Sequence, residues 1–280
     1  MKIACGTVLF RQHPLEKAMD AIREIGYEYV ETQAVGPWCP HITIGKSDPI
    51  QYADMVKSRG FKGTTALWMP YGTILSDERC VEYGIRTLEW AQAAGIPVIN
   101  TGDGYKPADM SDEEAFAVYE ERMGKLLEAA ERCKVGIAME PHGTFSLTGK
   151  GLQRLLAFSD SPWLGVNYDA CNIYRAGYIE SHGDEGDITK VASTKLGVED
   201  EVAVLESVVS RVLHVHAKDY HIDHCMPLGE GDVRVAECLE VLKKSGYTGA
   251  VSLETEGDED FDVSVEYAKK SFAFLKKHLG

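Results

Sequence analysis

The sequence lacks a long apolar run, a paired cysteine motif and a recognisable export signal. A membrane-spanning helix needs about 20 consecutive apolar residues, and no run among the 280 residues comes near that length. The seven cysteines are an odd number without any CxxC pair, so we expect reduced thiols rather than a disulfide framework or a zinc ribbon. The first residues, MKIACGTVLF, are typical of a strand and not of a signal peptide. These absences predict a cytoplasmic protein that does not bind a membrane.

Basic residues are scarce relative to acidic ones. The chain has 29 Lys and Arg against 44 Asp and Glu, which gives a net charge of −15. Because nucleic-acid binding relies on Lys and Arg to displace counterions from phosphates, this balance argues against DNA or RNA as a partner. The electric field around a protein with this negative net charge also disfavours an anionic substrate. A neutral small molecule is therefore the expected substrate.

Eight short apolar runs alternate with longer segments of helical periodicity along the whole chain. The predicted strands are Ile3–Val8, Tyr29–Gln33, Gly63–Met69, Pro97–Gly102, Val135–Glu140, Leu164–Asp169, Val212–Lys218 and Gly249–Thr255. Alternating strands and helices imply a parallel sheet covered by helices, and eight such units favour a closed barrel. Neither G-x-G-x-x-G after the first strand nor a GxxxxGKS or GxxxxGKT motif is present, which argues against a nucleotide-binding sheet. We predict an α/β fold, a (β/α)₈ TIM barrel, as one domain over residues 1–280.

Some of the intervening segments carry clear helix signals. Apolar residues recur at helical spacing over residues 15–25, and Gly26 follows as a stop. Ser111-Asp112-Glu113-Glu114 is a capping-box pattern, which predicts a helix that runs to about Cys133. The last helix is expected from about residue 263. The connection over 173–199 is long, and loops of this length in a compact domain are usually functional or mobile.

Ionisable residues stand at the ends of the last four predicted strands. Glu140, Asp169 and Glu254 come at or near the ends of the fifth, sixth and eighth strands, and His216 lies in the seventh. The strand ends of such a barrel carry its chemistry, so the four side chains should meet at one height. A single acidic residue at a strand end is more often a helix N-cap. Three inward carboxylates and an imidazole, however, are costly without a cation, and they predict one metal site.

The type of donor indicates which metal to expect. Three oxygen donors and one nitrogen suit Mn²⁺, Mg²⁺ or Co²⁺ better than a structural Zn²⁺, which prefers Cys and His. We expect one divalent ion, with Mn²⁺ as the first choice and Mg²⁺ or Co²⁺ as alternatives. His214 lies two residues before His216, on the same side of its strand but deeper.

The segments around these residues resemble the xylose isomerase-like TIM barrel superfamily. The similar segments are Ala138-Met139-Glu140-Pro141-His142-Gly143, Asn167-Tyr168-Asp169-Ala170-Cys171-Asn172, His214-Val215-His216-Ala217-Lys218-Asp219 and Ser252-Leu253-Glu254. The superfamily includes sugar isomerases, ketose 3-epimerases, inosose dehydratase and type IV apurinic endonucleases. The resemblance spans the whole chain and implies that Glu140, Asp169, His216 and Glu254 hold the metal. It also implies that Glu140 and Glu254 are catalytic, because in the epimerases the two glutamates move protons on opposite faces of the sugar.

Two positions depart from the epimerase pattern. Three residues after the ligand Asp, epimerases and the endonucleases usually place a His, whereas this chain has Asn172, which cannot shuttle a proton. Two residues after Glu140 stands His142, where the epimerases have an apolar residue. These changes put plain 3-epimerase activity in doubt. The endonucleases need further histidines after the third and fourth strands, and residues 67–70 and 100–103 contain none.

The resemblance implies a reaction that begins with loss of a proton next to a carbonyl. A divalent ion would stabilise the resulting enediolate, and a carboxylate or imidazole would take the proton. An enzyme that returns the proton to the neighbouring carbon, or to the opposite face of the same carbon, is a sugar isomerase or epimerase, and this is the first expectation. Expulsion of a β-substituent gives a lyase instead, either a dehydratase or an enzyme for 3-oxo-glycosides of the C-glycoside deglycosidase type, with His142 as acid or base. A non-catalytic sugar-binding subunit is a third alternative, and the intact Glu140 and Glu254 argue against it.

Further residues are expected to contact the sugar or sugar derivative. They are Asn172, Lys218, Trp68, Glu31 and His214. At two of these positions other roles are common, because Lys218 could be a surface charge and His214 a hydrogen-bonded interior residue. His221 and His224 are interpreted as loop residues, since a second metal site there would lack a fourth ligand. A homo-oligomer, or a complex with a small partner subunit, is the expected assembly.

Overall fold

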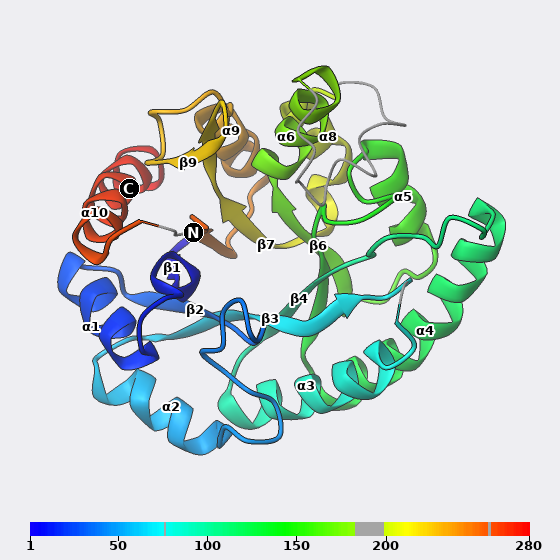
Figure 1. Ribbon diagram of the computed structural model, residues 1–280, viewed down its shortest axis with the longest axis horizontal. Coiled ribbons are helices and arrows are strands. Elements are labelled where there is room, and N and C mark those ends of the chain that lie inside the picture. The colour runs from blue at the N-terminus through cyan, green and yellow to red at the C-terminus, as the bar shows by residue number, and fades with distance from the viewer. Residues whose placement is uncertain (76, 183–198, 257–258) are drawn as a thin grey trace.

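Eight parallel strands close into a barrel, and helices form a ring around it (Figure 1). The computed structural model describes residues 1–75, 77–182, 199–256 and 259–280. Around the barrel the order is β1-β10-β7-β6-β5-β4-β3-β2, and every neighbouring pair is parallel. The last strand pairs with the first, with Lys2 opposite Ala250 and Cys5 opposite Leu253. The predicted (β/α)₈ TIM barrel is confirmed.

The helices and strands have the following bounds. The barrel strands are β1 (Lys2–Gly6), β2 (Tyr29–Gln33), β3 (Gly63–Thr73), β4 (Val98–Gly102), β5 (Gly136–Met139), β6 (Leu164–Asp169), β7 (Val212–Ala217) and β10 (Ala250–Leu253). Strands β8 (Asp219–His221) and β9 (His224–Met226) form an antiparallel hairpin after β7. The helices are α1 (Leu15–Ile25), α2 (Pro49–Ser58), α3 (Cys80–Ala94), α4 (Asp112–Cys133), α5 (Gly149–Ala157), α6 (Ala170–His182), α8 (Glu201–Val208), α9 (Val235–Ser245) and α10 (Phe261–Leu279), and the 3-10 helices are η1 (Thr7–Phe10) and η2 (Val209–Arg211).

The helix stop at Gly26 and the capping box at Ser111 are both found in the structure. α1 ends at Ile25, and Gly26 follows in the left-handed conformation with φ 116°, which glycine adopts without steric cost. At the start of α4 the Ser111 hydroxyl accepts a hydrogen bond from the Glu114 backbone while the Glu114 carboxylate accepts one from the Ser111 backbone. Within the described part of the chain, none of the helices combines the length and apolar character of a membrane span.

Several sequence-based boundaries are wrong, and among the strands β3 runs on to Thr73 whereas β10 already ends at Leu253. The first strand does not reach Val8, because residues 7–10 turn into the 3-10 helix η1. The expected long loop over 173–199 is helical in its first part, since α6 starts immediately after β6. The Asp169 carboxylate caps this helix by accepting hydrogen bonds from the backbone N–H groups of Cys171 (2.8 Å) and Asn172 (3.1 Å). Residues 183–198 of that connection lie outside the described residues.

The apolar core lies between the strands and the helices, while the inside of the barrel is polar toward the ends of the strands. Leu67 and Ile99, which are opposite one another on β3 and β4, are fully buried. Glu31, Asn100 and Asn167 are equally buried but polar. Polar groups so deep in a protein need hydrogen-bond partners or a bound ion, and this requirement determines the arrangement of the site.

The capping box at α4 gives a test of the fold. Replacing Ser111 by Ala removes one capping acceptor and should lower the free energy of unfolding by about 1 kcal/mol. Urea denaturation followed by circular dichroism would measure the loss. Ser210→Ala, an exposed position in η2, is the control and should change stability by less than about 0.5 kcal/mol. Equal effects of the two substitutions would contradict the capping role.

Candidate metal centre

Four ionisable side chains from neighbouring strands meet inside the barrel. Glu140 follows β5, Asp169 ends β6, His216 lies in β7 and Glu254 follows β10. One ligand atom of each residue lies within 4.8 Å of those of the other three, and all four residues are buried. Register explains the convergence, since His216 lies opposite Asp169 on β6 and opposite Ser252, two residues before Glu254, on β10. The structure therefore brings the four predicted ligands together.

The short contacts within the cluster run from cationic nitrogens to carboxylates. His216 Nδ1 lies 2.9 Å from Glu140 Oε2 and 3.2 Å from Glu254 Oε2. Lys218 Nζ lies 2.7 Å from Asp169 Oδ2 and 3.0 Å from Glu254 Oε2. Lys218 is only 1% exposed, so its ammonium group is an internal counter-charge of the cluster and not a surface charge.

Burial and the neighbouring charges shift the pKa values of the ionisable groups in this cluster. Burial, aided by the nearby carboxylate of Glu254, raises the pKa of Glu140 to about 8. Burial also raises the pKa of Asp169. The pKa of His216 is raised as well, because the attraction of Glu254, Glu31 and Glu140 outweighs the burial of its charged form. Each shift is the response of a group that must share a small buried space with several anions.

The donor set fits a divalent cation. Asp169 Oδ2 forms the ion pair with Lys218 but accepts no hydrogen bond of normal geometry, so it has free acceptor capacity. With a divalent ion bound, His216 neutral and the three carboxylates ionised, the ion and Lys218 together would balance the three negative charges of these carboxylates. Carboxylate oxygens with one imidazole nitrogen suit Mn²⁺, Mg²⁺ or Co²⁺. Glu140, Asp169, His216 and Glu254 are the residues that would hold the ion.

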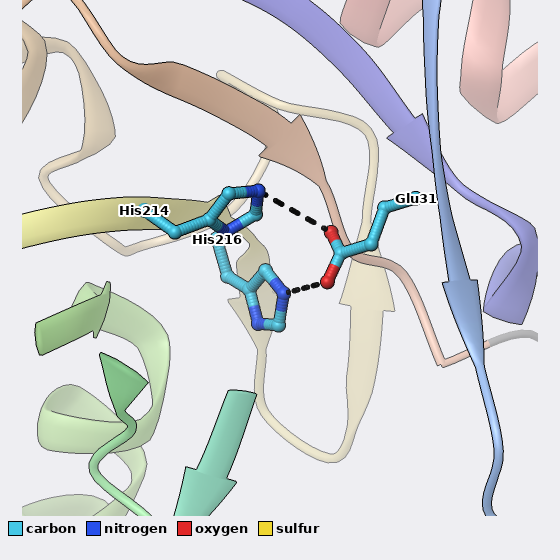
Figure 2. Close-up of side chains that lie close together, drawn as sticks. All are labelled: Glu31, His214 and His216. Carbon is cyan, nitrogen blue, oxygen red and sulfur yellow. Dashed lines mark hydrogen bonds and ion pairs between the residues drawn. The ribbon is translucent and has the colours of Figure 1, made fainter. Parts of the chain in front are cut away.

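A second layer of polar residues lies directly beneath the four candidate ligands. Glu31 Oε1 accepts hydrogen bonds from His216 Nε2 (2.8 Å) and from Asn100 Nδ2 (2.9 Å). Figure 2 shows the Glu31 carboxylate beside the two rings, with one oxygen facing His214 and the other facing His216. Burial lowers the pKa of His214 to about 4, so this imidazole is neutral and its 3.9 Å contact with Glu31 is not a salt bridge. Glu31 and His214, which the sequence suggested as substrate contacts, are thus enclosed against His216.

The remaining predicted residues lie around the cluster. Asn172 Nδ2 donates a hydrogen bond to Glu140 Oε1 at 2.9 Å. The half-buried Trp68 ring lies 6.3 Å from the His216 ring, nearly parallel to it, and 5.8 Å from the His142 ring in an edge-on contact. Trp68 therefore connects His142 to the candidate ligand His216, and His142 stands at the edge of the site.

Two residues that sequence reasoning missed hold the neighbourhood in place. Asp103, fully buried after β4, accepts hydrogen bonds from the Phe145 backbone N–H (2.7 Å) and the Ser146 hydroxyl (2.5 Å). Ser146 in turn accepts one from the His142 backbone N–H, so Asp103 fixes the loop that carries His142. Gln33 Nε2 lies 3.4 Å from Glu254 Oε1 as a weak donor. Both residues stand at strand ends, Gln33 as the last residue of β2 and Asp103 directly after β4, so the position that indicated the four candidate ligands was a detectable signal for these two as well.

His221 and His224 do not belong to the candidate metal centre. They lie on the β8–β9 hairpin, about half exposed, and pair with Asp232 (2.7 Å) and Asp223 (2.8 Å). Across the described ranges, the groups of residues close enough to share an ion all lie inside the barrel. The sequence-based interpretation of these two histidines as loop residues is wrong, because they belong to the two short strands of this hairpin.

Comparison with known proteins gives a family match over most of the chain. A family profile described as xylose isomerase-like TIM barrel matches residues 19–278. A curated relative, uncharacterized protein MJ1311 of Methanocaldococcus jannaschii, is 27% identical over 164 residues, which cover 56% of this chain and 47% of that protein. The chain thus spans about half the length of the curated relative that it matches.

Solved structures with the same fold cover the whole chain. A D-tagatose 3-epimerase-like protein superimposes with a TM-score of 0.76 at 21% identity over 100% of this chain and 97% of its own. The IOLI protein, solved with a bound zinc atom, gives 0.75 at 15% identity over 100% of both chains. The probable 3-DHS dehydratase AsbF of Bacillus anthracis gives 0.72 at 18% identity over 99% of both chains. At these identities the likeness establishes the shared fold.

The candidate metal centre predicts a stability change that does not depend on any substrate. After removal of metal with a chelator, Mn²⁺ at about 100 times its dissociation constant should stabilise the wild type by about 2.7 kcal/mol. Glu254→Gln and His216→Ala should each lose most of this gain, while Glu206→Gln, an exposed position on α8, should keep it. Elemental analysis and thermal unfolding measure the two effects. A wild type that Mn²⁺ stabilises no more than it stabilises Glu254→Gln would rule out the site.

Proposed function

The chain belongs to the xylose isomerase-like TIM barrel family, and on that premise we propose that it is a divalent-metal-dependent sugar isomerase or epimerase. The observation that carries the proposal is the buried cluster of Glu140, Asp169, His216 and Glu254. Two carboxylates from different sides of the cluster, Glu140 after β5 and Glu254 after β10, are available for proton transfer. The D-tagatose 3-epimerase-like protein of the same fold supports the reaction class.

The ion, with Mn²⁺ as our first choice, would supply Lewis acidity toward the oxygens of the bound sugar. The chain's own residues orient the two carboxylates that act as base and acid. Glu140 accepts hydrogen bonds from Asn167 (2.6 Å) and Asn172 (2.9 Å), so both of its oxygens are held. Glu254 accepts one from Lys218 (3.0 Å). A base held in one orientation needs little reorganisation to take the proton from a carbon next to a carbonyl.

A neutral sugar or sugar derivative is the substrate class that we propose. The net charge of −15 argues against nucleic acids and against strongly anionic ligands. The Trp68 ring beside the cluster offers an apolar face of the kind on which sugar rings stack. We propose a cytoplasmic location, with a homo-oligomer or a small partner subunit as the assembly, from the reduced cysteines and the resemblance.

His142 favours a second candidate reaction, a β-elimination. Its imidazole packs against Trp68 at the edge of the candidate metal centre, where it could protonate a leaving group once the α-proton has been removed. Asn172 cannot take that role, because an amide does not shuttle protons. The probable dehydratase AsbF has the same fold. We therefore keep a lyase, acting on 3-oxo-glycosides or as a dehydratase, as the alternative to the isomerase, with a non-catalytic sugar-binding subunit as the third.

Incubation of a panel of ketoses and 3-oxo-glycosides in D₂O would separate the two reactions. An isomerase or epimerase should place deuterium on carbon without releasing any group, and proton NMR would follow the exchange. A lyase should release water or an aglycone, and His142→Ala should then lower turnover at least 100-fold, the order expected for an acid–base residue, while Mn²⁺ binding is unchanged.

The same incubations carry their own controls. Glu140→Gln should abolish exchange in either reaction, and Glu206→Gln should leave it unchanged. Exchange that continues at the wild-type rate in chelator-treated protein would contradict the metal-dependent mechanism. Tight binding of a sugar without exchange or release would favour the sugar-binding subunit instead.

A further inference from the structure

The buried layer beneath the candidate ligands has a geometry that substrate contact does not explain. Glu31 is fully enclosed and contacts His216 and Asn100. We propose that Glu31 is a positioning residue that keeps the proton of His216 on Nε2, so that the Nδ1 lone pair faces the metal. The inference rests on the proposed metal-dependent function and deepens it.

The hydrogen bond between Glu31 and His216 indicates that Nε2 of the imidazole carries a proton. A neutral imidazole has one N–H donor and one acceptor nitrogen, and an ionised carboxylate only accepts. His216 Nε2 lies 2.8 Å from Glu31 Oε1 (Figure 2), so Nε2 is the donor. Nδ1 lies 2.9 Å from Glu140 and 3.2 Å from Glu254. An ion bound among these carboxylates would take the place of a proton on Nδ1, while Nε2 would keep its proton toward Glu31.

This arrangement has the geometry of a carboxylate–histidine–metal unit. A metal-bound imidazole commonly donates its other N–H to a carboxylate, which fixes the ring and makes the ligating nitrogen more basic. Asn100 Nδ2 donates to the same Glu31 oxygen at 2.9 Å, and the carboxylate is thereby held in place. The Trp68 ring, nearly parallel to that of His216, limits rotation of the imidazole from another side.

A parallel set of hydrogen bonds orients Glu140. His214 Nδ1 lies 2.9 Å from Asn167 Oδ1, and Asn167 Nδ2 donates to Glu140 Oε2 at 2.6 Å. His214 Nε2 lies 3.2 Å from the Thr65 hydroxyl, so both nitrogens of this ring have partners. These partners argue against a second metal at Glu31, His214 and His216, and they indicate instead one supporting layer for the ion above.

Metal affinity tests the role of Glu31 without any measurement of activity. Glu31→Gln keeps the shape of the side chain and an acceptor but removes its charge. Mn²⁺ titrated calorimetrically into metal-free protein should bind this variant 10- to 100-fold more weakly than it binds the wild type, the usual effect of losing such a partner. Glu201→Gln is the matched control, since Glu201 is also buried but lies at the start of α8, where it accepts a hydrogen bond from the Arg234 backbone. The control should bind Mn²⁺ as the wild type does.

Nitrogen NMR of histidine-labelled protein loaded with Zn²⁺ reports the proton directly. The wild type should show His216 protonated at Nε2 with Nδ1 shifted by the metal. Wild-type affinity for Mn²⁺ in Glu31→Gln, or a metal-shifted Nε2 in the wild type, would overturn the proposal while leaving the metal centre intact. A wild type that binds neither ion would instead overturn the proposed function, and the role of Glu31 with it.

Discussion

Burial of several carboxylates at one point is the constraint on which the rest of the site depends. Glu140, Asp169 and Glu254 lie together inside the barrel, and Glu31 adds a fourth carboxylate just beneath them. Moving an ion out of water costs on the order of several kcal/mol even after relaxation of the protein. The arrangement is stable only if cations and hydrogen-bond donors surround these oxygens.

The donors come from two sources with different consequences. Lys218 and His216 supply positive charge, and the former is buried in spite of its length. Asn100, Asn167 and Asn172 supply amide N–H groups that add no charge but fix where each oxygen points. Because these donors hold the carboxylate oxygens in place around a small buried space, the centre favours a small divalent cation over a bulkier ligand. Most of these residues lie on strands, whereas His142 lies on a loop that Asp103 anchors, so the outcome of the reaction can vary while the metal centre stays the same.

The fold and the four candidate ligands could be predicted because both follow from local patterns. Apolar runs of strand length separated by helical periodicity specify the barrel, and parallel register places the strand ends at one height, which brings Glu140 and Asp169 to the same level. The start of α6 was not predicted, because the role of Asp169 as its cap depends on geometry at the end of β6. The depth of Glu31 was not predicted either, since β2 and β7 are separated by β1 and β10 and only the closed barrel brings their side chains together. The burial of Lys218 likewise depends on its contacts with Asp169 and Glu254 from the two strands that flank β7, which no local pattern reveals.

A crystal structure of the protein grown with Mn²⁺, with data collected near the manganese absorption edge, tests the central claim most directly. The account predicts one anomalous peak inside the barrel, bound by Nδ1 of His216 and by a carboxylate oxygen from each of Glu140, Asp169 and Glu254. A peak held through Nε2 of His216, or no peak among these four side chains at saturating Mn²⁺, would contradict it.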